Sequence, residues 1–189
     1  MDKARKKYKI VLTIDGVGIL GFNSNMGMDG DWGEYENPFD ATQFMIIGVE
    51  PDEATSSTVP KIYPNCEIEL KVIFINENIN YQFAIDHIKM GMVGFAEFEK
   101  ATPREAWSYL FDLNKTDGAI GANGHYYLGQ THGADEFKIF TSSNINYESC
   151  NIAYSLRFSI KYCGRIKYCQ IDPLMRTSSD LQARGGELK

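Results

Sequence analysis

The chain contains little tryptophan, cysteine and proline, and it lacks a long hydrophobic run. Only 2 Trp, 4 Cys and 6 Pro occur among its 189 residues. No two cysteines form a CxxC pair, so we expect no zinc knuckle or thiol redox motif and interpret the thiols as free and structural. No apolar stretch approaches the ~20 residues that a helix needs to cross a bilayer. The sequence therefore favours a soluble domain without a membrane partner.

The chain also lacks an excess of positive charge. It carries 19 Lys and Arg against 25 Asp and Glu, a formal net charge of −6. This balance argues against a nucleic-acid partner, because such proteins neutralise phosphates. Positive residues gather in Met1–Lys9, but the apolar stretch that follows, Ile10–Ile14, is shorter than the ~7–15 residues of a signal-peptide core. We therefore expect a cytoplasmic protein.

Aromatic residues are abundant, and many of them alternate with polar ones. The chain has 11 Tyr and 11 Phe, a composition that favours strands. Alternation places every second side chain on one face of a strand, where it can be buried. The apolar faces predicted in this way are Tyr8, Ile10, Leu12 and Ile14; Ile68, Leu70, Val72 and Phe74; Ile79, Tyr81, Phe83 and Ile85; and Ile152, Tyr154, Leu156, Phe158, Ile160 and Tyr162.

The middle of the chain predicts a β-hairpin. Its arms are Glu67–Ile75 and Ile79–His87, which are separated by a short turn. Pairing even with odd positions puts both apolar sets on one face and sets Phe74 opposite Tyr81. His87 then falls in phase with the apolar face, so we interpret it as a core or rim histidine.

Three other segments carry local signals. Thr42–Val49 is almost entirely apolar and predicts a strand buried on both faces. Gly16–Pro38 is rich in Gly, Asn and Asp and predicts a long loop. Thr102 and Glu105 match a capping box with proline at the first helical position, which predicts a helix that ends near Asn114.

The turn at residues 163–164 leaves two registers open for the strand Arg165–Asp172. A two-residue turn would place Ile166 and Tyr168 on the face opposite Phe158. A three-residue loop with a bulge would bring all three residues to the same face. We favour the bulged register.

These segments together predict an all-β fold. Short strands, turns and a single helix are typical of an antiparallel β-sandwich, here jelly-roll-like and with one short helix. We expect one domain over residues 1–175, because a single domain is usual at this length. Residues 176–189 are polar and are expected to form a disordered tail.

Aromatic residues in glycine-rich loops are the candidates for binding a small ligand. Such sites combine an aromatic surface with a few polar groups that form hydrogen bonds. Trp32 lies in an acidic loop, and Tyr126 and Tyr127 follow Asn123 in a second glycine-rich segment. A small-molecule or glycan site is therefore predicted at Trp32, Asn123, Tyr126 and Tyr127.

The second of these segments also contains His125, His132 and Asp135, residue types that bind metal ions. These three residues are a candidate metal site. Their spacing matches no established metal motif, however, and we expect no cofactor. No G-x-S-x-G nucleophile motif occurs. The GxGxxG at Gly16–Gly21 has no helical pattern after it, so a dinucleotide site is not expected. We expect a protein that is not an enzyme.

Both ends of the chain carry the pattern of one bacterial family. The start is Tyr8-Lys-Ile-Val-Leu-Thr-Ile-Asp15 followed by Ile19-Leu20, and the end is Tyr154-Ser-Leu-Arg157-Phe158-Ser-Ile-Lys-Tyr-Cys-Gly164 followed by Ile171-Asp172-Pro173. In these segments the chain resembles the PixA/AidA-type inclusion-body proteins, which begin with a strand ending in Ile-Asp and close with an aromatic hairpin ending in Asp-Pro. The resemblance implies a cytoplasmic bacterial protein that accumulates, sometimes as inclusions. Its motifs are structural and imply no catalytic residues.

Two functional hypotheses follow. The first is a non-enzymatic β-sandwich that associates with itself through strand edges or through aromatic and Met-bearing loops, since an unpaired strand edge is a template for pairing. The second is a small-ligand or glycan-binding module that uses the loop aromatics named above.

Overall fold

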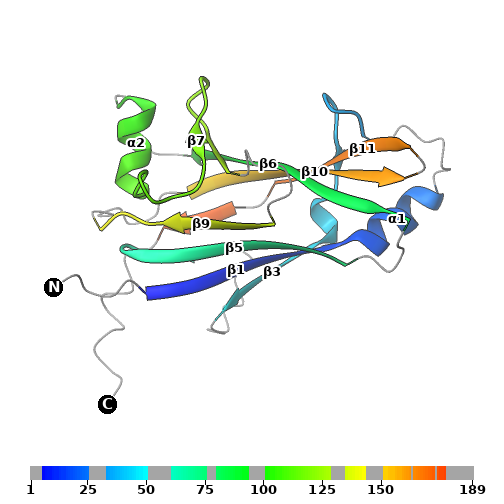
Figure 1. Cartoon of the computed structure of the whole chain (residues 1–189), viewed down its shortest axis with the longest axis horizontal. Helices are drawn as coiled ribbons and strands as arrows, with labels where there is room; N and C mark the ends of the chain where they lie inside the picture. Colours follow the sequence, from blue (N-terminus) through cyan, green and yellow to red (C-terminus); the bar gives the residue numbers. More distant parts are fainter. Residues whose placement is uncertain are drawn as a thin grey trace, which may run out of the picture.

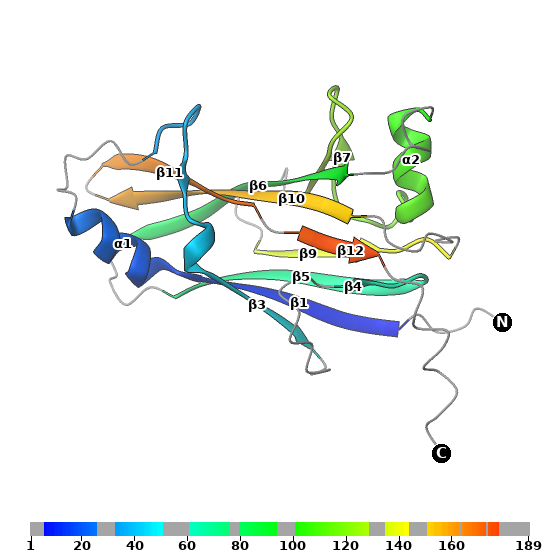
Figure 2. The same cartoon turned by 180° about the vertical axis from the view of Figure 1, so that it is seen from behind.

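Strands with one apolar face bury that face by stacking, and in the computed structural model they form a β-sandwich of two sheets (Figure 1). Helix α2 stands at one end of the sandwich and helix α1 at the other, as the view from behind also shows (Figure 2). The structure describes residues 6–25, 33–50, 61–75, 80–93, 101–128, 135–143, 151–162, 164–172 and 174–177.

The first sheet, called sheet A, has four strands in the order β3-β1-β5-β9. Strand β1 (Lys6–Asp15) pairs antiparallel with β3 (Met45–Glu50) and parallel with β5 (Cys66–Ile75). Strand β9 (Glu136–Phe140) is antiparallel to β5. Sheet A is therefore a mixed sheet with β3 and β9 at its edges.

The second sheet, called sheet B, is built on β10 (Asn151–Tyr162). One side of β10 pairs with β6 (Gln82–Val93), and the other pairs first with β11 (Arg165–Ile171) and then with β12 (Leu174–Thr177). Four shorter strands complete the sheet: β2 (Phe39–Asp40), β4 (Lys61–Ile62), β7 (Ala119–Ile120) and β8 (Tyr126–Leu128).

The predicted β-sandwich is confirmed, with two differences in detail. The sheets are mixed rather than purely antiparallel, because β1 runs parallel to β5 and two short strands run parallel to their neighbours. Strand β12 continues through residues 176 and 177, which the sequence analysis assigned to the tail. The remainder of that tail lies outside the described residues.

Two α-helices and one 3-10 helix accompany the sheets. Helix α2 (Pro103–Leu110) begins with the predicted capping box: the Thr102 hydroxyl accepts from the Glu105 N–H and the Glu105 carboxylate accepts from the Thr102 N–H. It ends at Leu110, earlier than predicted. Helix α1 (Gly16–Asn25) replaces part of the predicted loop, because the Asp15 carboxylate accepts from the Gly18 N–H at 2.8 Å and Ile19 is buried.

The alternating residues form the core between the sheets. Ile10, Leu12 and Ile14 of β1 are fully buried, and so are Ile68 and Leu70 of β5 and five residues of β10: Ile152, Tyr154, Leu156, Phe158 and Ile160. Each such side chain contributes on the order of 1.5–3 kcal/mol relative to its exposed state. Phe74 of β5 joins the two sheets, because its ring lies 4.9 Å from that of Phe83 and 5.2 Å from that of Phe158.

The predicted hairpin of Glu67–Ile75 with Ile79–His87 is wrong. Strand β5 pairs with β1 and β9 in sheet A, whereas β6 pairs with β10 and β8 in sheet B. The apolar faces of β5 and β6 do meet, but they meet across the sandwich rather than side by side in one sheet. The stacked rings of Phe74 and Phe83 mark this contact.

Two further predictions need correction. Thr42–Val49 is not a strand buried on both faces: residues 42–44 form a 3-10 helix, and Ile46 in the edge strand β3 is 69% exposed. The turn at residues 163–164 takes the two-residue form, since Tyr162 pairs with Arg165 and the register continues without a bulge. Gly164 supplies the positive φ of 78° that this tight turn requires.

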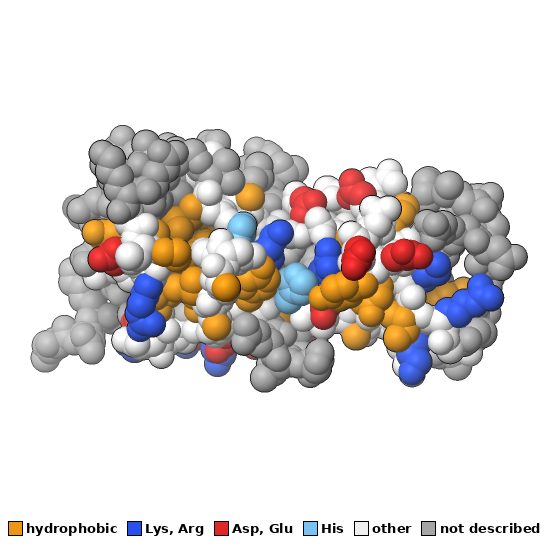
Figure 3. Space-filling view, turned by 90° about the horizontal axis from the view of Figure 1, so that it is seen from above, with side chains coloured by type: hydrophobic (Ala, Val, Ile, Leu, Met, Phe, Trp, Pro, Cys, Tyr) orange, Lys and Arg blue, Asp and Glu red, His pale blue; other side chains and the backbone are white. Residues whose placement is uncertain are grey.

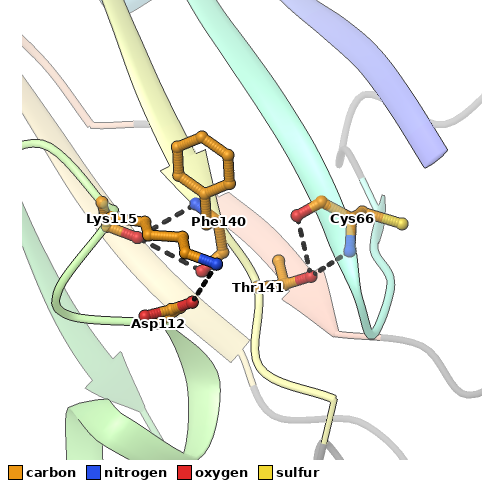
Figure 4. A network of polar contacts seen from close by, with 6 residues as sticks. Cys66, Asp112, Lys115, Phe140 and Thr141 are labelled. Atoms are coloured by element: carbon orange, nitrogen blue, oxygen red, sulfur yellow. Dashed lines mark hydrogen bonds and ion pairs between the residues drawn. The ribbon is translucent and has the colours of Figure 1, made fainter. Parts of the chain in front are cut away.

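The chain after α2 covers the outer edge of β9. The Asp112 and Asp117 N–H groups donate to the carbonyls of Phe140 and Lys138, and the Thr116 hydroxyl accepts from the Phe140 N–H at 3.0 Å. Figure 4 shows this cover beside Thr141, whose buried hydroxyl accepts from the Cys66 N–H and donates to the Tyr63 carbonyl, both at 2.7 Å. One edge of sheet A is therefore already paired within the chain.

We expect Thr141→Val to lower the free energy of unfolding by about 1–3 kcal/mol, because it removes the buried hydroxyl that bonds to the Cys66 N–H and to the Tyr63 carbonyl while keeping the side-chain shape. Urea unfolding followed by circular dichroism measures the change. Thr13→Val is the matched control on the outer face of β1, and its effect should stay within about 0.5 kcal/mol. Equal losses in both variants would contradict a role for the Thr141 hydroxyl.

Candidate functional site

The two edges of sheet A differ in their hydrogen bonding. The edge of β9 is covered by the chain after α2. On the far side of β3, by contrast, no strand pairs among the residues that the structure describes. Ile46 is 69% exposed there, and a side chain at Gly48 would meet no atom within 4 Å. Strand β3 therefore presents an edge without charged side chains at these two positions.

The outer face of sheet A is divided into a charged end and an apolar end. At the charged end, Lys7 and Lys9 of β1 form ion pairs with Glu67 and Glu69 of β5, each at 2.9 Å. At the other end, Thr13 lies between two exposed isoleucines, Ile46 of β3 and Ile73 of β5. The open edge is thus continuous with an uncharged surface.

The remaining edges are short or irregular. Strands β2, β4 and β7 contain two residues each, and short edge strands resist pairing with other chains. Strand β8 leaves the first half of β6 uncovered, but this half contains a bulge at Asp86 that disturbs further pairing. Among the described strands, β3 is therefore the edge best suited to accept another chain.

The bulge in β6 also determines which of its residues lie on the outer face of sheet B. Arg157 of β10 pairs with His87, but the next residue, Phe158, pairs with Ile85, so Asp86 is the extra residue. Before the bulge the odd-numbered residues of β6 face the core, and after it the even-numbered residues do. His87 consequently lies half-buried on the outer face opposite Arg157, and not in phase with the apolar face as the prediction of a core or rim histidine assumed. Figure 3 looks onto this face, on which histidine, hydrophobic and charged side chains lie next to one another.

His87 is oriented by two neighbours. Its Nδ1 lies 3.0 Å from the Asp86 carboxylate, and its ring packs against Tyr127 with 5.6 Å between centroids. Partial burial lowers the pKa of His87, and the positive charges of Arg157 and Lys89 act in the same direction, whereas Asp86 opposes them. The imidazole is therefore held neutral at neutral pH.

Arg157 is also held in place. Its guanidinium lies over the Tyr35 ring at 5.1 Å, and one Nη donates to the Gln170 amide oxygen at 3.3 Å. The Gln170 amide nitrogen in turn donates to both carboxylate oxygens of Asp172. The Arg157 Nε is buried and has no hydrogen-bond partner among the described residues. Arg157 thus carries a fixed positive charge with unused donors.

The predicted ligand residues are only partly brought together. Asn123 donates to the Tyr127 hydroxyl at 2.8 Å on the outer side of sheet B. Tyr126 is not available to a ligand: it is 2% exposed, packs against Trp107 and Phe111, and burial raises its pKa to about 12. Trp32 lies outside the described residues. A ligand site at Trp32, Asn123 and Tyr127 therefore stays a prediction.

The predicted metal ligands are placed on different sheets. His125 precedes β8 of sheet B and contacts Gly91, whereas Asp135 precedes β9 of sheet A. His132 lies outside the described residues. Within the described part of the chain, no group of three His, Cys, Asp or Glu side chains could hold a metal ion. Two of the cysteines, Cys66 and Cys169, are buried and belong to no disulfide bond within the described residues, as expected of structural thiols.

Sequence reasoning missed His87 and Arg157 as a pair, although the signal was present. The apolar residues of β6 change from odd positions, up to Ile85, to even positions, from Ile88 onward. A strand without a bulge cannot do this, because side chains alternate with a period of two. The change of parity marks the position where His87 moves to the outer face.

Comparisons with known proteins place few constraints on this β-sandwich protein. No family model matches the sequence, and no curated protein matches it. Among solved structures, the chain is similar to the crystal structure of a PixA inclusion body protein from Burkholderia cenocepacia, with a TM-score of 0.49, 10% identity, and coverage of 95% of this chain and 98% of that one. A likeness at this level does not establish family membership. No helix in the described residues is long and apolar enough to span a membrane.

We expect the stability of the protein to decrease as the pH falls below about 6.5, in part because of His87. Its folded pKa lies below the unfolded value of about 6.5, so the unfolded chain binds a proton first and stability declines as the pH falls below that value. His87→Gln should flatten this part of the curve of melting temperature against pH. An unchanged pH dependence would contradict the burial of a neutral imidazole.

Proposed function

We propose that this protein is a non-enzymatic, self-associating β-sandwich whose copies pair through strand β3, and that it accumulates in the bacterial cytoplasm. The observation that carries the proposal is the contrast between the two edges of sheet A. The edge of β9 is hydrogen-bonded to the chain after α2, whereas β3 has no strand on its far side among the described residues. Accumulation in the cell is supported by the resemblance of the chain ends to inclusion-body proteins.

The side chains of β3 favour a particular pairing of two copies. In a two-fold arrangement one surface patch meets itself, so two β3 strands run antiparallel. The faces stay in register only if even positions meet even ones. An axis through Ile47 satisfies this and sets Ile46 of each copy opposite Gly48 of the other, where no side chain obstructs it.

The two faces of such a pair are chemically consistent. On the inner face Met45, Ile47 and Val49 of both copies become neighbours and extend the apolar core. On the outer face Thr13 and Val11 lie opposite Ile46 and Gly48 within each copy, so no charge stands next to the joined edges. The pairing would therefore hide exposed isoleucine and place no charged side chain at these positions.

The test is the oligomeric state over a concentration series from about 1 µM to about 500 µM, measured by light scattering coupled to size exclusion. The wild-type chain should shift from monomer to dimer or larger species. The double substitution Ile46→Lys with Gly48→Lys should remain monomeric, because lysines on an edge strand repel a second copy. Both positions are exposed, so the fold should persist.

Ile75→Lys is the matched control. Ile75 is 45% exposed on the outer face of β5, two strands away from the open edge, so this variant should associate as the wild type does. A wild-type chain that stays monomeric over the whole range would contradict self-association. Association that persists in the double variant would contradict the assignment to β3.

A further inference from the structure

We propose that Arg157 and His87 on the outer face of sheet B form a binding site for a small, singly charged oxyanion, such as a carboxylate or phosphate group. This site lies on the sheet opposite to β3 and is independent of self-association. The two side chains stand directly opposite one another on neighbouring strands, where Cβ atoms are about 5 Å apart, so one small group can contact both.

Arg157 has more donors than its neighbours use. A guanidinium carries five N–H groups in a planar fork that matches a carboxylate or phosphate. The one hydrogen bond described for Arg157 goes from an Nη to Gln170, and its buried Nε has no partner within the part of the chain that the structure describes. A buried donor of this kind calls for an acceptor such as an ion or a water molecule.

The site is arranged in advance of any ligand. Tyr35 fixes Arg157 from one side and is itself in edge-to-face contact with Tyr168 at 5.1 Å. Gly33 anchors the Tyr35 segment on β11, because its carbonyl accepts from the Tyr168 N–H and its φ of 103° permits the close approach. Pre-organised groups lose little freedom on binding, which favours even a small ligand.

His87 supplies the second polar group. Its Nδ1 faces the Asp86 carboxylate, so Nδ1 is the protonated nitrogen. Nε2 is then an acceptor in the neutral ring and becomes a donor when the ring takes up a second proton. An oxyanion beside Arg157 would stabilise that charged form, so binding and protonation of His87 are coupled.

Acidic residues around the site limit the charge of the ligand. Glu34 and Glu36 flank Tyr35, and both are exposed. Asp172 holds Gln170, which pairs with Asp40 of β2. These carboxylates would repel the outer charges of a polyanion, whereas a single charge can be neutralised by Arg157. The geometry therefore favours a small ligand over a nucleic acid.

The test uses two probes, sodium formate and inorganic phosphate, at constant ionic strength with sodium chloride as the reference. The His87 ring resonance, identified by its loss in His87→Gln, reports on binding by NMR. The chemical shift of the wild-type resonance should change with probe concentration and reach a plateau. If only formate or only phosphate has this effect, the ligand group is a carboxylate or a phosphate, respectively. Arg157→Gln should weaken binding at least ~10-fold, because it removes a charged hydrogen-bond donor.

Lys161→Gln is the matched control. Lys161 lies on the same face of the same strand as Arg157, but it is exposed and pairs with Gln82 and Ile166 rather than with His87. Its loss removes the same charge and should change binding less than ~2-fold. Near-ultraviolet circular dichroism checks that each variant is folded.

The pH dependence distinguishes this site from simple charge attraction. The groups that face His87 are Asp86 and Lys89 on β6, Arg157 on β10 and Tyr127 on β8. Formate keeps its single charge between about pH 5.5 and about pH 7.5, the range in which an imidazole can take up a proton. Formate should bind several-fold more tightly to the wild type at the lower pH. Binding to His87→Gln, which lacks the reporting ring, is measured by isothermal titration calorimetry beside the wild type, and this variant should show no such difference.

Three results would overturn the proposal. The first is no saturable shift of the His87 resonance with either probe up to about 50 mM. The second is undiminished binding in Arg157→Gln. The third is tighter binding of tripolyphosphate than of phosphate, which would contradict the selection for a single charge.

Discussion

The pairing of β10 with β6 is the constraint on which both faces of sheet B depend. It aligns two twelve-residue strands and contains one bulge, at Asp86. On the inner face, the bulge allows β6 to bury side chains beside those of β10 both before and after Asp86. On the outer face it places His87 opposite Arg157 and beside the Tyr127 ring. One extra residue thus fixes the core and the candidate site together.

Alternation predicted which residues of each strand are buried, but it did not predict which strands pair with one another. Ile10, Leu12 and Ile14 were predicted as core residues and are fully buried, because a period of two is a local property of the chain. The partner of a strand depends on contacts that are distant in sequence. Phe74 and Phe83 illustrate the difference, since the apolar pattern brings them together whether their strands share a sheet or face across a sandwich.

The candidate site was less predictable for the same reason. Tyr127 and Asn123 were predicted from their loop, and they are in contact. Tyr126 is adjacent in sequence but points into the core, since neighbouring residues of a strand face opposite sides. Arg157 appeared only as an outward position in a strand, and its role depends on Tyr35, Gln170 and His87, which come from three other parts of the chain.

Edge pairing and ligand binding would use different layers of the sandwich. Pairing through β3 joins two copies of sheet A edge to edge, and sheet B of each copy then lies on one side of the joined sheet. The outer face of sheet B points away from sheet A, so the Arg157 position stays open in such a pair. Any coupling between the two functions would have to pass through the core between the sheets, to which the contacts of Phe74 with Phe83 and Phe158 belong. The two surfaces share no residue, so each copy in an assembly should retain its own accessible site.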